Sequence, residues 1–179
     1  IALSMSLMEG TGSDWLSLAL VDGRGFANSF ATLMVGVFFV AMVVTRATGS
    51  LVLMRDGRVA VIRGGALLCI VGIVVVILVP APWAAVVGAV LWGAGCALGF
   101  PVGISAAADD PEHAVKSVAA VSAIAYGAYL VGPMLIGFLG EHLGLLRAFW
   151  PLVAIALLCF AIAGAAREPA RAETAPAER

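Results

Sequence analysis

Apolar residues fill long windows of this sequence, and short polar or Gly/Pro-rich stretches separate them. A helix needs roughly 20 apolar residues to cross the hydrocarbon core of a bilayer, and the chain offers about six such windows. We therefore predict an all-α membrane protein with transmembrane helices over residues 1–20, 28–47, 61–80, 82–105, 115–139 and 147–166. Residues 167–179 are rich in Ala, Glu, Arg and Pro, cannot bury an apolar face, and are predicted to form a disordered tail.

Composition agrees with this pattern and excludes some functions. Hydrophobic residues make up 63% of the chain and charged residues 12%, and the mean hydropathy is +1.10. A soluble core of this length could not hide so much apolar surface, so a lipid bilayer is the expected environment. The net charge of −1 gives no reason to expect nucleic-acid binding. Because Ile1 is not an initiator residue, we expect the chain to be part of a larger protein.

The distribution of basic residues predicts the orientation. If the connection after the second window faces the cytoplasm, eight of the ten basic residues lie on that side, and only Arg24 and Arg147 lie outside. Both ends of the chain are then cytoplasmic. Those on the cytoplasmic side are Arg46, Arg55, Arg58, Arg63, Lys116, Arg167, Arg171 and Arg179.

Two acidic residues in the first window are the strongest functional signal. An ionised carboxylate at membrane depth costs roughly 3 kcal/mol or more unless it is paired, hydrated or protonated. Glu9 lies deeper, which favours a cavity-facing role as a solute partner or proton carrier; the rival is an ion pair with an Arg or Lys outside this chain. Asp14, nearer the outer end, is expected to cap the helix or reach interfacial water. The intervening glycines and hydroxyls predict a helix that unwinds or lines a wet cavity.

Several weaker candidates lie elsewhere. Asn28, Trp92, Tyr126 and Tyr129 carry polar groups suited to a solute path, although such aromatics more often pack between helices or mark interfaces. The cysteines lack metal-ligand spacing, and we predict neither a metal nor a cofactor. No hydrolase, zinc-protease or phosphate-binding motif is present, which argues against an enzyme.

Glycine and proline mark the fourth and fifth windows. Gly95, Gly99 and Gly103 recur at four-residue spacing, which places small surfaces on one helix face, and Pro101 removes a backbone hydrogen bond and favours a kink. This pattern is typical of helices that bend or slide, and equally of tight packing in a bundle.

The segment from Thr45 to Arg58 is a Gly-rich basic loop between two windows, with Gly49, Arg55, Gly57 and Arg58 at characteristic spacing. It resembles the cytoplasmic loop of major facilitator superfamily transporters, except that Ser50 stands where that family has an acidic residue. The resemblance implies that Arg55 and Arg58 hold one access state at the cytoplasmic mouth, and we expect Arg46 to join them in one gate network.

Taken end to end, residues 1–166 resemble the C-terminal six-helix half of such a transporter, most like the bacterial branch near fucose permease. The resemblance implies a 3+3 inverted repeat, a missing N-terminal half, and a small solute, sugar-like or organic, moved by alternating access across the bacterial cytoplasmic membrane, with protons coupled through Glu9. The alternative is a non-transporting membrane module that binds a partner protein or scaffolds assembly.

Overall fold

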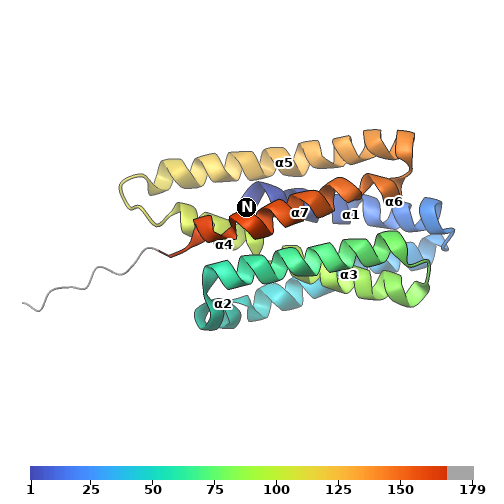
Figure 1. Cartoon of the computed structure of the whole chain (residues 1–179), viewed down its shortest axis with the longest axis horizontal. Helices are drawn as coiled ribbons and strands as arrows, with labels where there is room; N and C mark the ends of the chain where they lie inside the picture. Colours follow the sequence, from blue (N-terminus) through green and yellow to red (C-terminus); the bar gives the residue numbers. More distant parts are fainter. Residues whose placement is uncertain (169–179) are drawn as a thin grey trace, which may run out of the picture.

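The structure, a computed structural model, describes residues 1–168 of the 179-residue chain and contains no strand in that range. The expected disordered tail lies outside the described residues from 169 onward. Long helices run side by side along the longest axis (Figure 1). The helices are α1 (Ala2–Arg24), α2 (Asn28–Leu78), α3 (Pro82–Cys96), α4 (Gly99–Ala107), α5 (Ala114–Leu143), α6 (Leu145–Ala148), α7 (Trp150–Ile162) and the 3-10 turn η1 (Ala163–Ala166).

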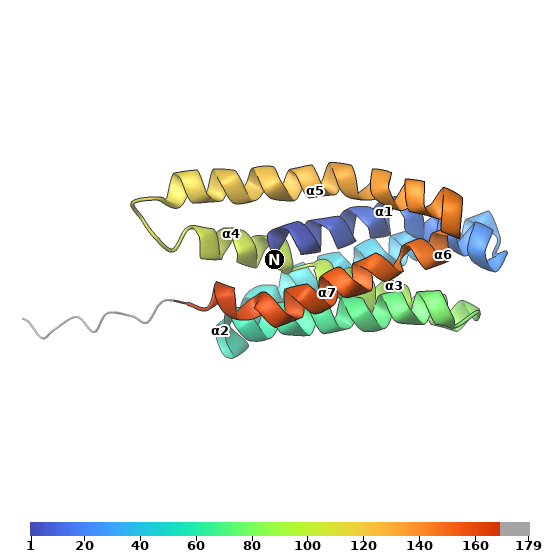
Figure 2. The same cartoon turned by 45° about the horizontal axis from the view of Figure 1, so that its top comes forward.

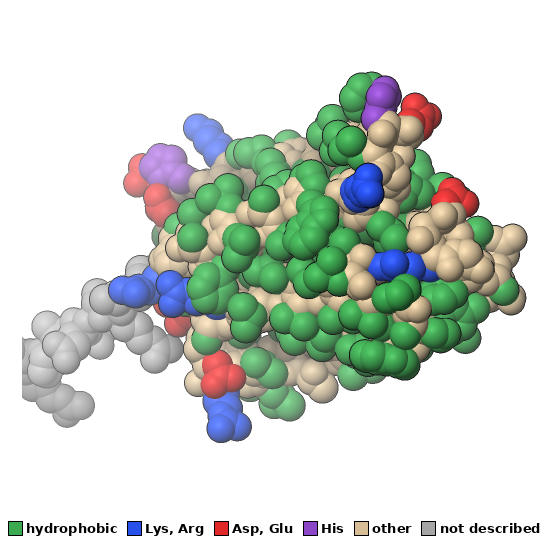
Figure 3. Space-filling view, turned by 45° about the vertical axis from the view of Figure 1, so that its right-hand side comes forward, with side chains coloured by type: hydrophobic (Ala, Val, Ile, Leu, Met, Phe, Trp, Pro, Cys, Tyr) green, Lys and Arg blue, Asp and Glu red, His purple; other side chains and the backbone are tan. Residues whose placement is uncertain are grey.

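Four helical stretches are long and apolar enough to cross a bilayer: Asn28–Leu78, Pro82–Ala107, Ala114–Leu143 and Leu145–Ala166. The space-filling view shows apolar side chains over the middle of one face, with charged side chains gathered toward its two ends (Figure 3). α1 has the length to cross a bilayer, but its acidic, hydroxyl and glycine residues make it more polar than the other long helices. Six separate membrane-spanning helices stay a prediction.

α2 is two helical arms joined at a single residue. Gly57 has φ 75° and ψ 168°, a conformation essentially restricted to glycine, and the residues on either side of it are helical. The arms lie beside each other (Figures 1 and 2). The segment 45–58 is therefore not the loop we expected: its Leu, Val and Met residues continue the helix, and the reversal takes place at Gly57.

The ends of α1 and α2 meet at one end of the bundle. Arg24, in the last turn of α1, donates hydrogen bonds to the carbonyls of Val76 and Ile77 near the C-terminus of α2. A cation favours that position because the last carbonyls of a helix have no intrahelical partner and carry partial negative charge. Gly57 lies at the opposite end of the bundle.

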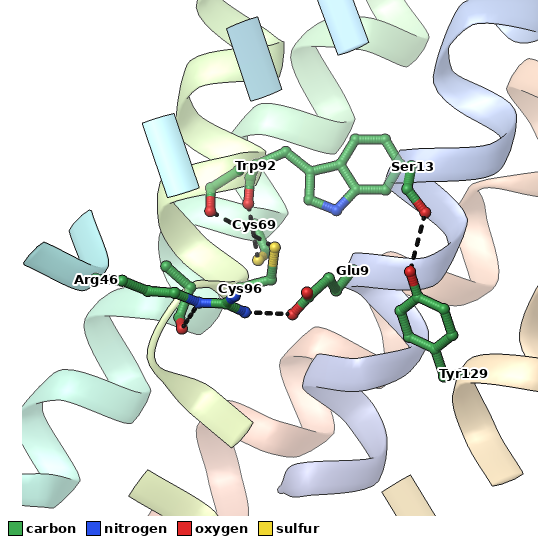
Figure 4. A network of polar contacts seen from close by, with 9 residues as sticks. Glu9, Ser13, Arg46, Cys69, Trp92, Cys96 and Tyr129 are labelled. Carbon is green, nitrogen blue, oxygen red and sulfur yellow. Dashed lines mark hydrogen bonds and ion pairs between the residues drawn. The ribbon is translucent and has the colours of Figure 1, made fainter. Parts of the chain in front are cut away.

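The core is centred on aromatic rings from three helices. Trp92 of α3 meets Phe38 of α2 and Phe149, just before α7, in edge-to-face contacts with centroid separations of 5.9 and 5.4 Å. All three side chains are fully buried. Cys69, Cys96 and Cys159 lie in the same core as free, buried thiols (the first two appear in Figure 4).

The helix of the fourth window is interrupted just before Pro101. α3 ends at Cys96 and α4 begins at Gly99, so the helix is interrupted within the turn that precedes Pro101. Proline cannot donate a backbone hydrogen bond to the carbonyl four residues earlier, which here is the carbonyl of Ala97. Pro133 lies inside α5 without ending that helix.

Candidate functional site

An ion pair between α1 and α2 is the central polar contact within the bundle. Arg46 Nη2 lies 2.8 Å from Glu9 Oε2 (Figure 4). The Glu9 side chain is 19% exposed and that of Arg46 is 42% exposed, so the pair sits at the boundary between the core and an accessible face. Glu9 thus has a partner within this chain, and the rival expectation of a cation from outside the chain is not needed to account for it.

A helix break holds the guanidinium of Arg46 in place. Arg46 Nε donates to the carbonyl oxygen of Ala97 at 3.0 Å. This is the carbonyl left without its usual helical donor by Pro101. Two acceptors therefore orient the Arg46 guanidinium. One is the Glu9 carboxylate, and the other is the Ala97 carbonyl, which is free to accept because Pro101 has no N–H to donate to it.

Open space lies next to this pair. A cavity of about 280 Å³ adjoins Arg46 and is lined by Gly49, Leu53, Leu98 and Pro101 among others. Gly49 is buried against Leu98, whose Cδ2 would lie 2.4 Å from an added Cβ. Gly49, which we assigned to a gate loop, is therefore a helical packing residue beside the cavity.

The rest of the acidic segment remains helical. α1 is a continuous helix from Ala2 to Arg24, so the expected unwinding is wrong. Gly10 and Gly12 do not break the helix; they allow other helices to pack closely against it. An added Cβ at Gly10 would lie 3.2 Å from the backbone oxygen of Tyr129, and one at Gly12 would lie 2.7 Å from Phe38. The glycines allow neighbouring helices to approach α1.

Asp14 lies in the middle of α1, so it does not cap a helix. Its side chain is exposed, and Oδ1 accepts from the Ser13 hydroxyl at 2.9 Å. The Tyr129 hydroxyl lies 3.5 Å from Ser13 Oγ. Ser13, Asp14 and Tyr129 thus form a second small polar group on α1 and α5, separate from the Glu9–Arg46 pair (Figure 4 draws Ser13 and Tyr129).

The other solute-path candidates are scattered. Trp92 is fully buried in the aromatic core. Tyr126 is 64% exposed and packs against Phe100 at a centroid separation of 6.0 Å. Asn28 is exposed at the start of α2, at the end of the bundle where Arg24 lies. The structure therefore does not bring Asn28 and Tyr126 to the ion pair.

The three arginines that we expected in one gate network are separated. Arg46 precedes Gly57 by eleven residues, about 16 Å along a helix, and pairs with Glu9. Arg55 is 87% exposed, and its one ion-pair partner among residues 1–168 is its neighbour Asp56, at 3.9 Å. Arg58 pairs with Asp109 in the α4–α5 connection.

Arg58 is nonetheless well enclosed. Its side chain is 12% exposed, and it also donates to Ser105 Oγ at 3.0 Å. The hydrogen bond to Asp109 raises the pKa of Arg58 against the opposing effect of desolvation. Arg58 therefore stays charged at physiological pH and joins the reversal of α2 to the α4–α5 connection.

Sequence reasoning missed two of these acceptors. Asp109 lies in an acidic run with Asp110 and Glu112, for which the sequence pattern indicated no partner. The Ala97 carbonyl was detectable in principle, because Pro101 marks the carbonyl four residues before it as lacking a helical donor. No group of three or more His, Cys, Asp or Glu side chains in residues 1–168 could hold a metal ion.

Comparison with known proteins identifies the family. The family model described as Major Facilitator Superfamily matches residues 2–179. An uncharacterized MFS-type transporter of Yersinia pestis is 33% identical over 168 residues, covering 93% of this chain and 43% of that protein. An uncharacterized transporter of Sinorhizobium fredii is 36% identical over 165 residues, covering 92% of this chain and 41% of that protein.

The chain thus spans about two fifths of the length of these curated relatives. No solved structure matches it significantly. The family match covers nearly the whole sequence, and it agrees with the long apolar helices. The chain belongs to the Major Facilitator Superfamily, a family of multi-pass membrane transporters.

Proposed function

We propose that this chain is the C-terminal six-helix half of a secondary active transporter of the fucose-permease-like branch. The transporter moves a small solute, sugar-like or organic, across the bacterial cytoplasmic membrane by alternating access, and it couples this movement to protons. An N-terminal half supplies the other wall of the solute path. The coverage of the two curated relatives supports this, because each is more than twice as long as the matched region.

The observation that carries the proposal is the Glu9–Arg46 ion pair. Placing two charges among apolar helices costs free energy, and a 2.8 Å pair with a backbone anchor recovers part of it. The pair is partly exposed, so water or a solute can reach it. The Glu9 carboxylate can then exchange its guanidinium partner for a proton, which would link its state to both solute and proton. Replacing such a pair with well-packed apolar residues is often neutral or stabilising, so stability alone gives little reason to keep it.

The proposed architecture is two three-helix units of inverted topology. The first consists of α1 and the two arms of α2, and the second of α3 with α4, α5, and α6 with α7. Both ends of the chain face the cytoplasm in this arrangement, which the arginines near Gly57 and Lys116 in the first turn of α5 support. The Arg58–Asp109 pair then lies at the cytoplasmic mouth and joins the two units.

Uptake into proteoliposomes by the full-length protein tests the proposal. Glu9→Gln is compared with wild type at two pH values, for a panel of sugars and small organic solutes. We expect wild-type uptake to depend on the pH gradient and Glu9→Gln uptake to lose that dependence. Asp14→Asn is the matched control, because it neutralises an exposed acid on the same helix that has no Arg partner within the described residues.

Two results would change the reading. Unaltered proton-driven uptake by Glu9→Gln would remove Glu9 from the proton path while leaving the transporter proposal intact. Absence of flux for every solute, with correctly folded protein, would favour the alternative of a non-transporting membrane module.

A further inference from the structure

The indole of Trp92 has an unused hydrogen-bond donor in the core. Its side chain is completely buried, and Nε1 has no hydrogen-bond partner among the described residues. An unsatisfied buried N–H costs about 1–3 kcal/mol, so native proteins nearly always supply it with an acceptor or an ordered water. An acceptor or an ordered water for this nitrogen is therefore expected close to the indole.

The indole faces the helix that carries Glu9. An added Cβ at Gly12 would lie 3.4 Å from Cε2 of Trp92, the ring carbon bonded to Nε1. Gly12 follows Glu9 by three residues, so the two positions lie on neighbouring parts of one face of α1. Figure 4 shows the indole nitrogen on the side of the ring toward Glu9 and Cys96.

Glu9 has an acceptor to spare. The contact with Arg46 uses Oε2, and a carboxylate offers about four acceptor positions on its two oxygens. Within residues 1–168 no hydrogen bond to Oε1 of Glu9 is formed. A buried donor and an underused acceptor thus occur on adjoining faces of α3 and α1.

We propose that Trp92 is a positioning residue for Glu9: its indole N–H holds one buried water molecule, and that water donates to the free oxygen of the Glu9 carboxylate. Such a water would have polar partners on both sides, as ordered internal waters do. Glu9 then has two supports, the Arg46 guanidinium on one oxygen and the Trp92-bound water on the other. The inference rests on the proposed function only in giving the Glu9–Arg46 pair a role.

Other groups could also influence the indole. Cys96 lies one turn after Trp92 on α3, within the electrostatic reach of Glu9 and Arg46. Cys69, on the second arm of α2, donates to the Trp92 carbonyl at 3.7 Å. α7 contributes Cys159 to the same core, and α5 contributes Tyr129 beyond Ser13. Of these groups, Glu9 alone is a carboxylate, so a response at acidic pH points to Glu9.

The test is the nuclear magnetic resonance signal of the indole N–H, recorded without any solute on full-length protein carrying ¹⁵N-labelled tryptophan. Trp92→Phe assigns the signal; if that variant does not fold, replacing Trp15, Trp83, Trp150 and every tryptophan of the remaining part of the full-length protein assigns it by elimination. We expect the Trp92 indole proton to resonate as a hydrogen-bonded donor and to shift as the pH falls, and we expect Glu9→Gln to abolish the shift. The exposed Trp83 signal is the internal control.

Two results would overturn the inference. One is a Trp92 signal at the position of an indole without a hydrogen bond at every pH, and the other is an identical pH response in Glu9→Gln. Neither result depends on flux. A protein that transports solute but shows no Glu9-dependent shift refutes the role of Trp92 alone, whereas a Glu9-dependent shift without transport refutes only the proposed function.

Discussion

Arg46 illustrates how a single residue acquires its role from its partners. Its position in a basic segment suggested a place in a gate network, yet it lies within a continuous helix and contacts a carboxylate and a backbone carbonyl. Arg55 belongs to the same basic segment, and in the described part of the chain it pairs with its neighbour Asp56 alone. The two arginines should therefore differ in what their removal costs.

Arg46→Gln is expected to lower the free energy of unfolding by about 1–3 kcal/mol, because the Glu9 carboxylate and the Ala97 carbonyl both lose a donor. Arg55→Gln should change it by about 0.5 kcal/mol or less, as expected for an exposed ion pair. Thermal unfolding in detergent measures both. Equal effects of the two substitutions would contradict the assignment of Arg46 as the anchored residue.

At the scale of elements, α2 depends on one glycine and α3 with α4 on one proline. The arms of α2 reverse at Gly57, where φ is positive and no atom lies within 4 Å of an added Cβ. Backbone conformation rather than space therefore excludes other residues at this position.

Gly57→Ala should destabilise the protein by about 1–3 kcal/mol through backbone strain alone. Gly36→Ala is the matched control: Gly36 also lies in α2 with open space around it, but its φ is not positive. Alanine in a regular helix is more favourable than glycine by about 1 kcal/mol, so the control should be neutral or stabilising. Unfolding temperatures of the two variants should thus move in opposite directions or differ clearly; a stabilised Gly57→Ala would contradict the single-residue reversal.

The interruption between α3 and α4 makes a second prediction. Pro101→Ala restores an N–H that can bond the Ala97 carbonyl, which then depends less on Arg46. Arg46→Gln should therefore cost about 0.5–1.5 kcal/mol less in the Pro101→Ala background than in wild type.

A double-mutant cycle of unfolding free energies measures that coupling. The same cycle with Pro133→Ala is the control, because Pro133 lies in α5, away from the Arg46 contact. We expect additivity there. Additivity in both cycles would show that the freed carbonyl does not matter to Arg46.

For the molecule as a whole, the two ends of the bundle differ in their number of basic residues. Arg24 lies at the end where α2 begins and finishes, and Arg147 lies in α6 next to that end, in a cavity shared with Asp22. Arg55, Arg58 and Arg167 lie at the other end, beside Gly57, and Lys116 lies in the first turn of α5, just after the connection that holds Asp109. The excess of basic residues at this second end predicts that it faces the cytoplasm.

Single cysteines at exposed positions test this orientation in a background without the native, buried cysteines. Arg147→Cys should react with a membrane-impermeant maleimide in intact cells. Arg55→Cys should react only after the membrane is permeabilised. The reverse labelling pattern would invert the topology, and labelling of both in intact cells would contradict a fixed orientation.

Hydropathy predicted much of the fold, because a bilayer imposes the same requirement on every segment: about 20 apolar residues in a helix that satisfies its own backbone. The long helices over residues 28–78, 82–107, 114–143 and 145–166 follow from that requirement. The one-residue reversal at Gly57 did not, since a basic, glycine-containing segment is compatible with either a loop or two abutting helices.

The candidate site divides in the same way. A carboxylate at membrane depth is costly wherever its partner lies, so the sequence alone singled out Glu9 as a candidate functional residue. It could not name Arg46 as the partner, since the two are 37 residues apart and meet only when α1 packs on α2. Nor could it place Trp92 in the core and Tyr126 on the surface, because aromatic residues with a polar group occur in both environments and the sequence does not distinguish the two. Composition determined that the chain lies in lipid and therefore that its segments are helical. Tertiary packing decided which polar groups meet, because contacts between helices depend on their crossing angles and on the rotation of each helix about its axis, and no local sequence pattern encodes these.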